Sequence, residues 1–466
     1  MLRGHVRRII AWNSHSQHSI LLLLLALTLV RGLIYVAVIP PWQPPDEPYH
    51  FLSGQSANVQ REVDPQARWQ QLQAEVIGSL LQFRFWDTVV FFPSVRSPED
   101  AMRYLPTGLS DSPQPIVPRA FVYSVLALIL RPVQYQDVAT QLYVARTFSV
   151  LINLGVVTVA YWVGALLFGR DPFGRLLLPI SIVMLSSHTA LMSAVNEDNP
   201  AELFAAVSIL SLVYGMVRGP RWYVLLPVVL FAGLAVATKP TTYYLIPVLA
   251  LLLLIYGWRK TSGAWKLLVL PVLLALLFGL RLMSSRFESI VQVMFSYLSG
   301  PESDRFLSAL VTAPSQAYLA DIVSSFWADM GWRSLQVEEA WGWALLLPTV
   351  GAIVGLVKLT WCCVRPGAPK DQRALLCRVA WVFVLCLACD VAFMAGGAAT
   401  GNYGFVSRYL MGATLPIMAL LVIGWRELIP TSWRREGFAA LTSFFFLFDA
   451  LALGGYALPF FYPLWR

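Results

Sequence analysis

Long apolar runs separated by short polar stretches dominate this chain. A helix that crosses a membrane needs about 20 predominantly apolar residues, and on that measure the sequence predicts eleven spans. They cover residues 19–40, 142–168, 176–194, 200–217, 222–238, 241–258, 267–283, 341–363, 376–395, 408–425 and 438–460. The pattern therefore predicts an all-α integral membrane protein with a single transmembrane domain over residues 1–466.

The stretch Arg119–Leu130 decides the topology. It has only about a dozen residues between Pro118 and Arg131-Pro132, too few to cross a bilayer. If it does not cross, the clusters of Lys and Arg between the spans face the cytoplasm, as the positive-inside rule requires. We therefore predict a helix lying in the outer interface, with the amino terminus inside and the carboxyl terminus outside.

This topology leaves two long outer segments, roughly residues 41–141 and 284–340. The first contains a helical pattern over Arg68–Leu81, with apolar residues such as Trp69, Leu72 and Val76. We expect this outer segment to be folded, with interfacial helices. The chain shows no internal sequence repeat, which disfavours a transporter built from two related halves.

Composition narrows the class of protein. Of 466 residues, 57% are hydrophobic and 13% are charged, which excludes a soluble globular protein. The 34 Lys and Arg residues exceed the 26 Asp and Glu, but they cluster between apolar runs as topology signals do, so we expect no nucleic-acid partner. All five cysteines fall in one late pair of apolar segments and its loop, so no extracellular disulfide framework is expected.

The stretch Pro41–Phe51 follows the first span and carries Asp46, Glu47 and His50. Pro44-Pro45 suits the start of a helix, which would place both carboxylates in the first turn and keep them ionised. Asp46 and His50 are four residues apart and would share a helix face, so the imidazole could orient or partly neutralise the carboxylate. In the alternative interpretation, Asp46 is a plain helix cap and His50 an interfacial side chain.

Other polar residues gather at the same outer boundary. Glu197 and Asp198 lie in the turn after the third span, Lys239 ends the fifth, and Arg408 with Tyr409 opens the tenth. The acidic turn could be a simple helix cap, and the basic residues could extend to the interface. The predicted topology leaves few basic residues on the outer side of the membrane. The presence of Lys239 and Arg408 there nevertheless favours an anionic partner, and we expect a lipid phosphate.

Aromatic residues crowd the same boundary, and most are expected to form an interfacial belt. Trp327 and Trp332 are the candidates for stacking on a sugar or acceptor. No zinc-type cluster is present, although Asp46, Glu47 and Asp198 could supply oxygen ligands for Mg²⁺ or Mn²⁺. The sequence has no Gly-rich phosphate loop and no Gly-x-Ser-x-Gly motif, so nucleotide chemistry and a serine-hydrolase mechanism have no support.

The residues Pro44–Phe51 resemble the Pro-Asp-Glu-x-x-His-Phe signature of a bacterial family of multispanning membrane proteins of unassigned function. That family in turn resembles the GT-C superfamily of polyprenyl-phosphate-dependent glycosyltransferases. Shorter matches are Tyr143–Arg146, Glu197-Asp198, Thr238–Pro240, Phe326-Trp327 with Gly331-Trp332, and Ser407–Tyr409 with Pro416. The chain departs from the pattern at Val406-Ser407, where the family tends to have Gln-Gly, and at Gln114–Pro118, where it has a Pro-Pro-Leu-Tyr-like segment.

The resemblance implies a GT-C-like fold in the bacterial plasma membrane and sugar transfer at its outer face. The donor would be a polyprenyl-phosphate-linked sugar and the acceptor a glycan, lipid or protein. Asp46 would be the general base, oriented by Glu47 and His50, and Asp198 with Glu197 would form a second acidic position. Arg408, Lys239 and Tyr409 would bind the donor phosphate.

Two other classes of function stay open. A transporter or lipid flippase would use the charges inside predicted spans, Arg31, Asp390 and Asp449, as pathway residues. Arg31 and Asp390 could alternatively form a structural pair. A non-catalytic scaffold for a cell-envelope complex would tolerate replacement of both Asp46 and Arg408.

Overall fold

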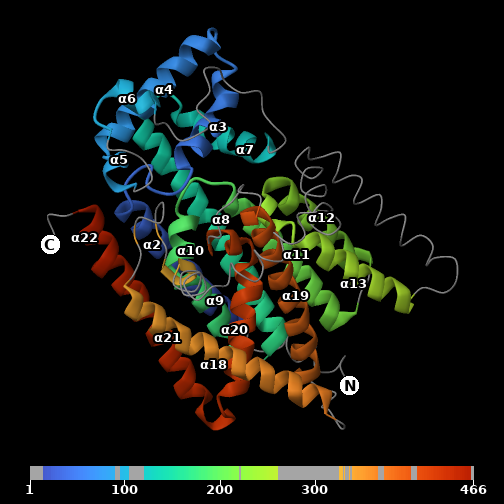
Figure 1. Ribbon diagram of the computed structural model, residues 1–466. Helices are drawn as coiled ribbons and strands as arrows, with labels where there is room; N and C mark the ends of the chain where they lie inside the picture. Colours follow the sequence, from blue (N-terminus) through green and yellow to red (C-terminus); the bar gives the residue numbers. More distant parts are fainter. Residues whose placement is uncertain are drawn as a thin grey trace.

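In the residues that it describes, the computed structural model consists of helices joined by turns and loops, with an isolated bridge between Met330 and Leu335 (Figure 1). The described residues are 14–89, 95–103, 120–169, 171–219, 222–260, 325–328, 330, 335, 338–365, 372–399 and 407–462. Within them, seven helices are long and apolar enough to cross a membrane, or up to eight if one bent pair counts as a span. The predicted all-α, multi-pass class is therefore confirmed.

Seven of the predicted spans correspond to long helical segments. These are α2 (Ser14–Val38), α8 (Val138–Phe168), α11 (Asp198–Arg218), α18 (Glu339–Val364), α19 (Gln372–Ala399), the segment Ser407–Leu428 with η4 (Ser407–Ala413) and α20 (Thr414–Leu428), and Thr431–Phe461. The last segment contains η5 (Thr431–Trp433), α21 (Arg434–Leu451), η6 (Ala452–Ala457) and α22 (Leu458–Phe461).

The other predicted spans are shorter or broken. The one over 176–194 consists of α9 (Pro172–Val183) and α10 (Ser186–Met192), bent by 58° at their junction. Those over 222–238 and 241–258 correspond to the shorter apolar helices α12 (Trp222–Thr238) and α13 (Leu245–Lys260), joined by η2 (Pro240–Thr242). The span expected over 267–283 lies outside the described residues.

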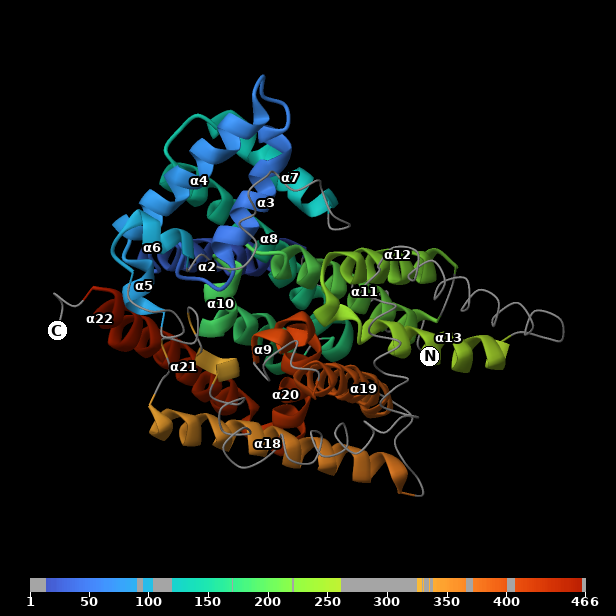
Figure 2. The same cartoon turned by 45° about the horizontal axis from the view of Figure 1, so that its top comes forward.

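A cap of short helices stands at one end of the long helices (Figures 1 and 2). It consists of α3 (Glu47–Val59), α4 (Pro65–Gln82), α5 (Phe85–Thr88), α6 (Pro98–Arg103), α7 (Ala120–Leu130) and η1 (Arg131–Val133). The helix predicted over residues 68–81 is present within α4, and its buried residues Trp69, Leu72 and Val76 belong to one core with Trp42 and Phe51. The described residues of the segment 41–141 therefore form a packed helical unit at one end of the bundle.

Helix α7 occupies the stretch that decides the predicted topology, and it spans only 11 residues. It packs so closely on α3 that a Cβ at Gly54 would lie only 2.5 Å from Leu126 Cδ2. The side-chain amide of Asn58 also donates to the Ala127 carbonyl at 2.9 Å. Glycine at position 54 thus permits the close approach that brings α7 over the end of the bundle.

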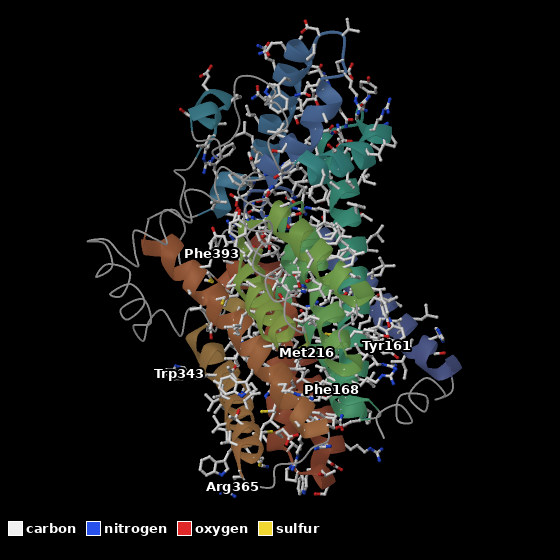
Figure 3. All side chains as sticks on the ribbon, turned by 90° about the vertical axis from the view of Figure 1, so that its right-hand side faces the viewer. Tyr161, Phe168, Met216, Trp343, Arg365 and Phe393 are labelled. Atoms are coloured by element: carbon white, nitrogen blue, oxygen red, sulfur yellow. The ribbon has the colours of Figure 1, made fainter. Side chains whose placement is uncertain are left out.

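At the end of the bundle opposite the cap, ion pairs tie the long helices together. Asp171, the residue before α9, accepts from Arg426 at 2.7 Å and from Arg434 at 3.0 Å. In Figure 3 the cap helices are at the top, and Phe168 and Arg365 lie toward the opposite, lower end of the bundle. Helices α18 and α20 approach so closely that a Cβ at Gly355 would lie 1.8 Å from the Gly424 carbonyl oxygen.

Candidate functional site

Asp46 and Arg408 form an ion pair at the cap end of the bundle, although 362 residues separate them in sequence. Arg408 Nη2 lies 2.8 Å from Asp46 Oδ2, and the two side chains are 27% and 38% exposed, respectively. Asp46 comes from the loop between α2 and α3, and Arg408 from η4. The structure thus joins a carboxylate and a guanidinium that both remain accessible to a ligand.

The sequence pattern predicted that Asp46 lies in the first turn of a helix. In the structure, Asp46 lies just before the helix instead. Helix α3 begins at Glu47, and Asp46 is the preceding cap residue with φ 61°, in the left-handed region. Its side chain forms no cap hydrogen bond. Asp and Asn adopt this conformation more readily than most side chains do. The backbone therefore turns the Asp46 carboxylate away from the helix and toward Arg408.

Glu47 has the opposite environment from its neighbour. It is fully buried and receives two hydrogen bonds from Arg146, at 2.9 and 2.6 Å. The backbone amides of Trp42 and Val195 also donate to it, at 2.9 and 3.1 Å. Because its carboxylate oxygens are engaged in this way, Glu47 fastens the loop that carries Asp46 to α8 and to the segment after α10. We therefore expect Glu47 to act by positioning.

Arg146 completes this anchor and was given no role from sequence. Its guanidinium also donates to the carbonyls of Ile39, at 2.6 Å, and Pro40, at 2.9 Å, just past the end of α2. A charged residue inside an apolar span is expensive unless it has a partner or a function. The position of Arg146 within the predicted span 142–168 was therefore the available signal for this contact.

His50 is linked to the second acidic position through Tyr123 on α7. His50 Nδ1 lies 2.8 Å from the Tyr123 hydroxyl, and that hydroxyl donates to Glu197 Oε2 at 3.3 Å. The Tyr123 hydroxyl thus lies within hydrogen-bond distance of both His50 and Glu197. Burial lowers the pKa of His50 to about 4. The imidazole is thus neutral at pH 7, and the charge facing Asp46 comes from Arg408.

Tyr123 could not be singled out from sequence, because it lies in a short apolar helix with no charged residue within its 11 positions. The tertiary fold alone brings α7 beside α3 and places this hydroxyl between His50 and Glu197.

Lys239 is held by the two acidic residues at the start of α11, Glu197 just before the helix and Asp198 as its first residue. Its ammonium lies 3.1 Å from Glu197 Oε1 and 3.3 Å from Asp198 Oδ2. The exposed fractions of Lys239, Glu197 and Asp198 are 12%, 2% and 15%. Lys239 thus balances two carboxylates in a largely buried cluster, next to the more exposed Asp46–Arg408 pair.

The remaining predicted site residues lie in different settings. Tyr409 contacts Arg408, with the hydroxyl 3.4 Å from Nη2 and the guanidinium carbon 5.1 Å from the ring centroid. Trp327 is buried, at 2% exposure, and stacks on Phe445 with 5.3 Å between ring centroids. Its ring therefore packs in the core, and Trp332 lies outside the described residues.

The three carboxylates considered as ligands for Mg²⁺ or Mn²⁺ do not converge on one point. Asp46 pairs with Arg408, Glu47 with Arg146, and Asp198 with Lys239. Across the described part of the chain, no group of three or more His, Cys, Asp or Glu residues is placed to hold a metal ion. We therefore assign no catalytic step to a metal.

Among the charges inside the spans, Arg31 pairs with Asp449, so the suggested pairing of Arg31 with Asp390 is wrong. Asp449 Oδ2 accepts from Arg31 Nε at 2.6 Å, and Asp449 Oδ1 accepts from Tyr35 at 2.6 Å and from Ser186 at 2.9 Å. Arg31 also donates to the Val183 carbonyl, where α9 ends. This network fixes the break between α9 and α10.

Asp390 is fully buried in α19, and neither carboxylate oxygen has a hydrogen-bond partner among the residues that the structure describes. It belongs neither to the Arg31 network nor to the ion pairs at the cap end.

We compared the chain with models of known protein families and with curated proteins, and neither comparison gives a match. The assignment of function therefore depends on the geometry described above.

One prediction concerns the pH dependence of stability. Because the pKa of His50 is lowered from 6.5 to about 4 in the folded protein, the unfolded chain binds more protons between these values. Stability is complete above pH 6.5 and is lost as the pH falls toward 4, by on the order of 2 kcal/mol near pH 5. Thermal melting in lipid nanodiscs at pH 7 and pH 5 measures this loss.

The control for this prediction is His50→Gln, which keeps an amide donor for Tyr123 but does not titrate. We expect its pH dependence to be flatter than that of the wild type. Equal pH dependence in the two proteins would assign the effect to another group.

Proposed function

We propose that this protein is a membrane glycosyltransferase with a GT-C-like fold, which moves a sugar from a polyprenyl-phosphate carrier to an acceptor hydroxyl. The observation that carries the proposal is the accessible Asp46–Arg408 ion pair at the cap end of an apolar helix bundle. A base and a phosphate-binding cation at that depth suit a donor whose lipid tail lies in the bilayer and whose head group reaches the surface. We place this end at the outer face of the bacterial plasma membrane.

In the proposed reaction, the Asp46 carboxylate removes the proton from the acceptor hydroxyl as its oxygen attacks the anomeric carbon. The bond between that carbon and the phosphate oxygen breaks, and the electron pair leaves with the carrier phosphate. Arg408 stabilises the negative charge on the departing phosphate. Attack from the opposite side inverts the anomeric carbon. A phosphate leaves as a weak base, so the reaction needs no separate general acid.

The neighbouring residues hold this pair in position. Glu47 and Arg146 anchor the backbone before Asp46, and Tyr409 lies against the Arg408 guanidinium. Lys239, Glu197 and Asp198 form a second charged cluster connected to His50 through Tyr123. We propose that this cluster sets the charge of the surroundings in which the acceptor binds. A glycan, a lipid and a protein all present the hydroxyl that the reaction requires.

The test is transfer by the full-length protein in proteoliposomes that contain a radiolabelled polyprenyl-phosphate-linked sugar and an acceptor fraction from bacterial envelopes. A panel of carrier-linked hexoses, pentoses and amino sugars covers the donor. We expect label to move from the carrier to the acceptor only when the folded protein is present. Folded protein that transfers no sugar from any carrier in the panel would contradict the proposal.

The second candidate is a transporter or lipid flippase, and the bent pair α9/α10 is the observation that favours it. Broken helices beside buried charges form the pathways of many transporters. Here the break lies against Arg31 and Asp449, and Asp390 is buried in the same bundle. Movement of carrier-linked sugar across the proteoliposome membrane, without transfer to the acceptor, would support this function over the glycosyltransferase.

A further inference from the structure

The Asp46–Arg408 contact engages the two groups that the reaction needs separately. A carboxylate bound to a guanidinium is a weaker base, and a guanidinium bound to a carboxylate is less able to hold a phosphate. In the structure, one guanidinium nitrogen meets one carboxylate oxygen, at 2.8 Å. Both side chains stay partly exposed, so a ligand can reach the contact. The pair therefore describes the resting protein.

The neighbouring ion pairs are built differently. Arg146 and Glu47 share two hydrogen bonds, and their side chains are 1% and 0% exposed. Lys239 lies between two carboxylates and is 12% exposed. Separating either of these pairs would leave a buried charge without a partner, which costs much more than separating an exposed pair. Arg408 is therefore the basic residue of this site that can most readily change its partner.

We propose that Arg408 exchanges partners during the reaction, an inference that rests on the proposed function. In the resting protein it neutralises Asp46. When the carrier phosphate arrives, its oxygens take up the Arg408 guanidinium, and the Asp46 carboxylate is released to act as the base. The ligand class is a lipid phosphate whose anionic oxygens can accept the two parallel N–H groups of a guanidinium.

This exchange makes binding ordered. Before the donor is bound, the contact with Arg408 makes Asp46 a weaker base toward an acceptor hydroxyl or a water molecule. After the donor is bound, Asp46 becomes available next to the sugar. The exchange also means that Asp46 and the phosphate compete for Arg408, and this competition can be measured without sugar transfer.

The experiment measures binding of sugar-free polyprenyl monophosphate to the full-length protein in phosphatidylcholine nanodiscs, with inorganic phosphate as a second probe. Removing the competing carboxylate by Asp46→Asn should tighten binding roughly fivefold, the equivalent of about 1 kcal/mol for this half-buried ion pair. Arg408→Gln should weaken it roughly tenfold to a hundredfold. Unfolding cannot produce tighter binding, so the first result would not be an effect on folding.

Matched controls use the same substitutions elsewhere in the cap. Asp64→Asn changes the aspartate that precedes α4, and Arg131→Gln changes an exposed arginine, and both should leave affinity unchanged. Asp46→Gly is a second variant without the carboxylate, since glycine adopts φ 61° without strain. It should show the same gain as Asp46→Asn.

The outcomes separate the ligand sources and the two proposals. Tighter binding of both probes shows that the phosphate group alone is recognised, and tighter binding of the lipid alone shows that the carrier tail is required. If neither Asp46 variant tightens either probe, or if Arg408→Gln has no effect, the exchange is overturned even where sugar transfer is observed. If binding tightens but no sugar is transferred, the exchange holds and the glycosyltransferase proposal fails.

Discussion

Replacing Asp46 by Asn is expected to lower sugar transfer by a factor of about 10² to 10⁴ while the protein stays folded. The amide cannot accept the proton of the acceptor hydroxyl, so the attacking oxygen must lose its proton without a positioned base. Binding of the donor should be retained, because Arg408 is then free of its resting partner. The expected loss therefore lies in the rate of transfer at saturating donor.

Asparagine is the appropriate replacement for structural reasons. Position 46 has φ 61°, and Asn is among the side chains that adopt this conformation with little strain. The carboxylate of Asp46 caps no helix and is 38% exposed, so its loss leaves no buried group without a partner. We expect its melting temperature to stay close to that of the wild type.

The measurement is the initial rate of transfer in proteoliposomes, with the amount of folded protein determined by melting. Asp64→Asn is the control, because it makes the same substitution at the residue before α4, where the side chain accepts from Ala67 N at 3.0 Å. A folded Asp46→Asn protein with the wild-type rate would remove Asp46 from the role of general base. A similar loss in the Asp64→Asn protein would show that the effect is not local to the site.

The main features of the helix bundle were accessible from sequence because length and hydropathy define a span almost independently of tertiary structure. The positions of α2, α8 and α11 follow directly from apolar runs. The number of spans is harder to predict from sequence. Both α12 and the α9/α10 pair have the composition expected of spans, but neither forms a long straight helix. The break after Val183 depends on Arg31 and Asp449, which lie far away in the chain.

Some features of the candidate site could likewise be predicted from sequence, and others could not. Asp46 and Arg408 could be proposed from topology, since both were expected at one boundary of the membrane. The different roles of Asp46 and Glu47 could not, because adjacent carboxylates in a sequence give no sign of which one is buried. That difference comes from Arg146, which approaches Glu47 from 99 residues away. Tyr123 likewise enters the site only through the packing of α7 on α3.

Separating Glu47 from Arg146 should destabilise the protein by about 3 to 5 kcal/mol, the largest stability effect that we expect at this site. Glu47→Gln leaves the guanidinium of Arg146 buried, at 1% exposure, opposite a neutral amide. Arg146→Met leaves the Glu47 carboxylate buried without its ion pair. Chemical denaturation in detergent micelles measures the change in the free energy of unfolding for each protein. By comparison, Asp46→Asn should change it by less than about 1 kcal/mol.

The double replacement Glu47→Gln with Arg146→Met separates anchoring from catalysis. Removing both charges takes away the cost of an unpaired buried ion, so we expect the double variant to be more stable than either single variant. If Glu47 only positions Asp46, sugar transfer should recover along with stability. Recovery of stability without recovery of transfer would instead assign the Glu47 carboxylate a direct part in the reaction, and failure to recover either would place the instability outside this ion pair.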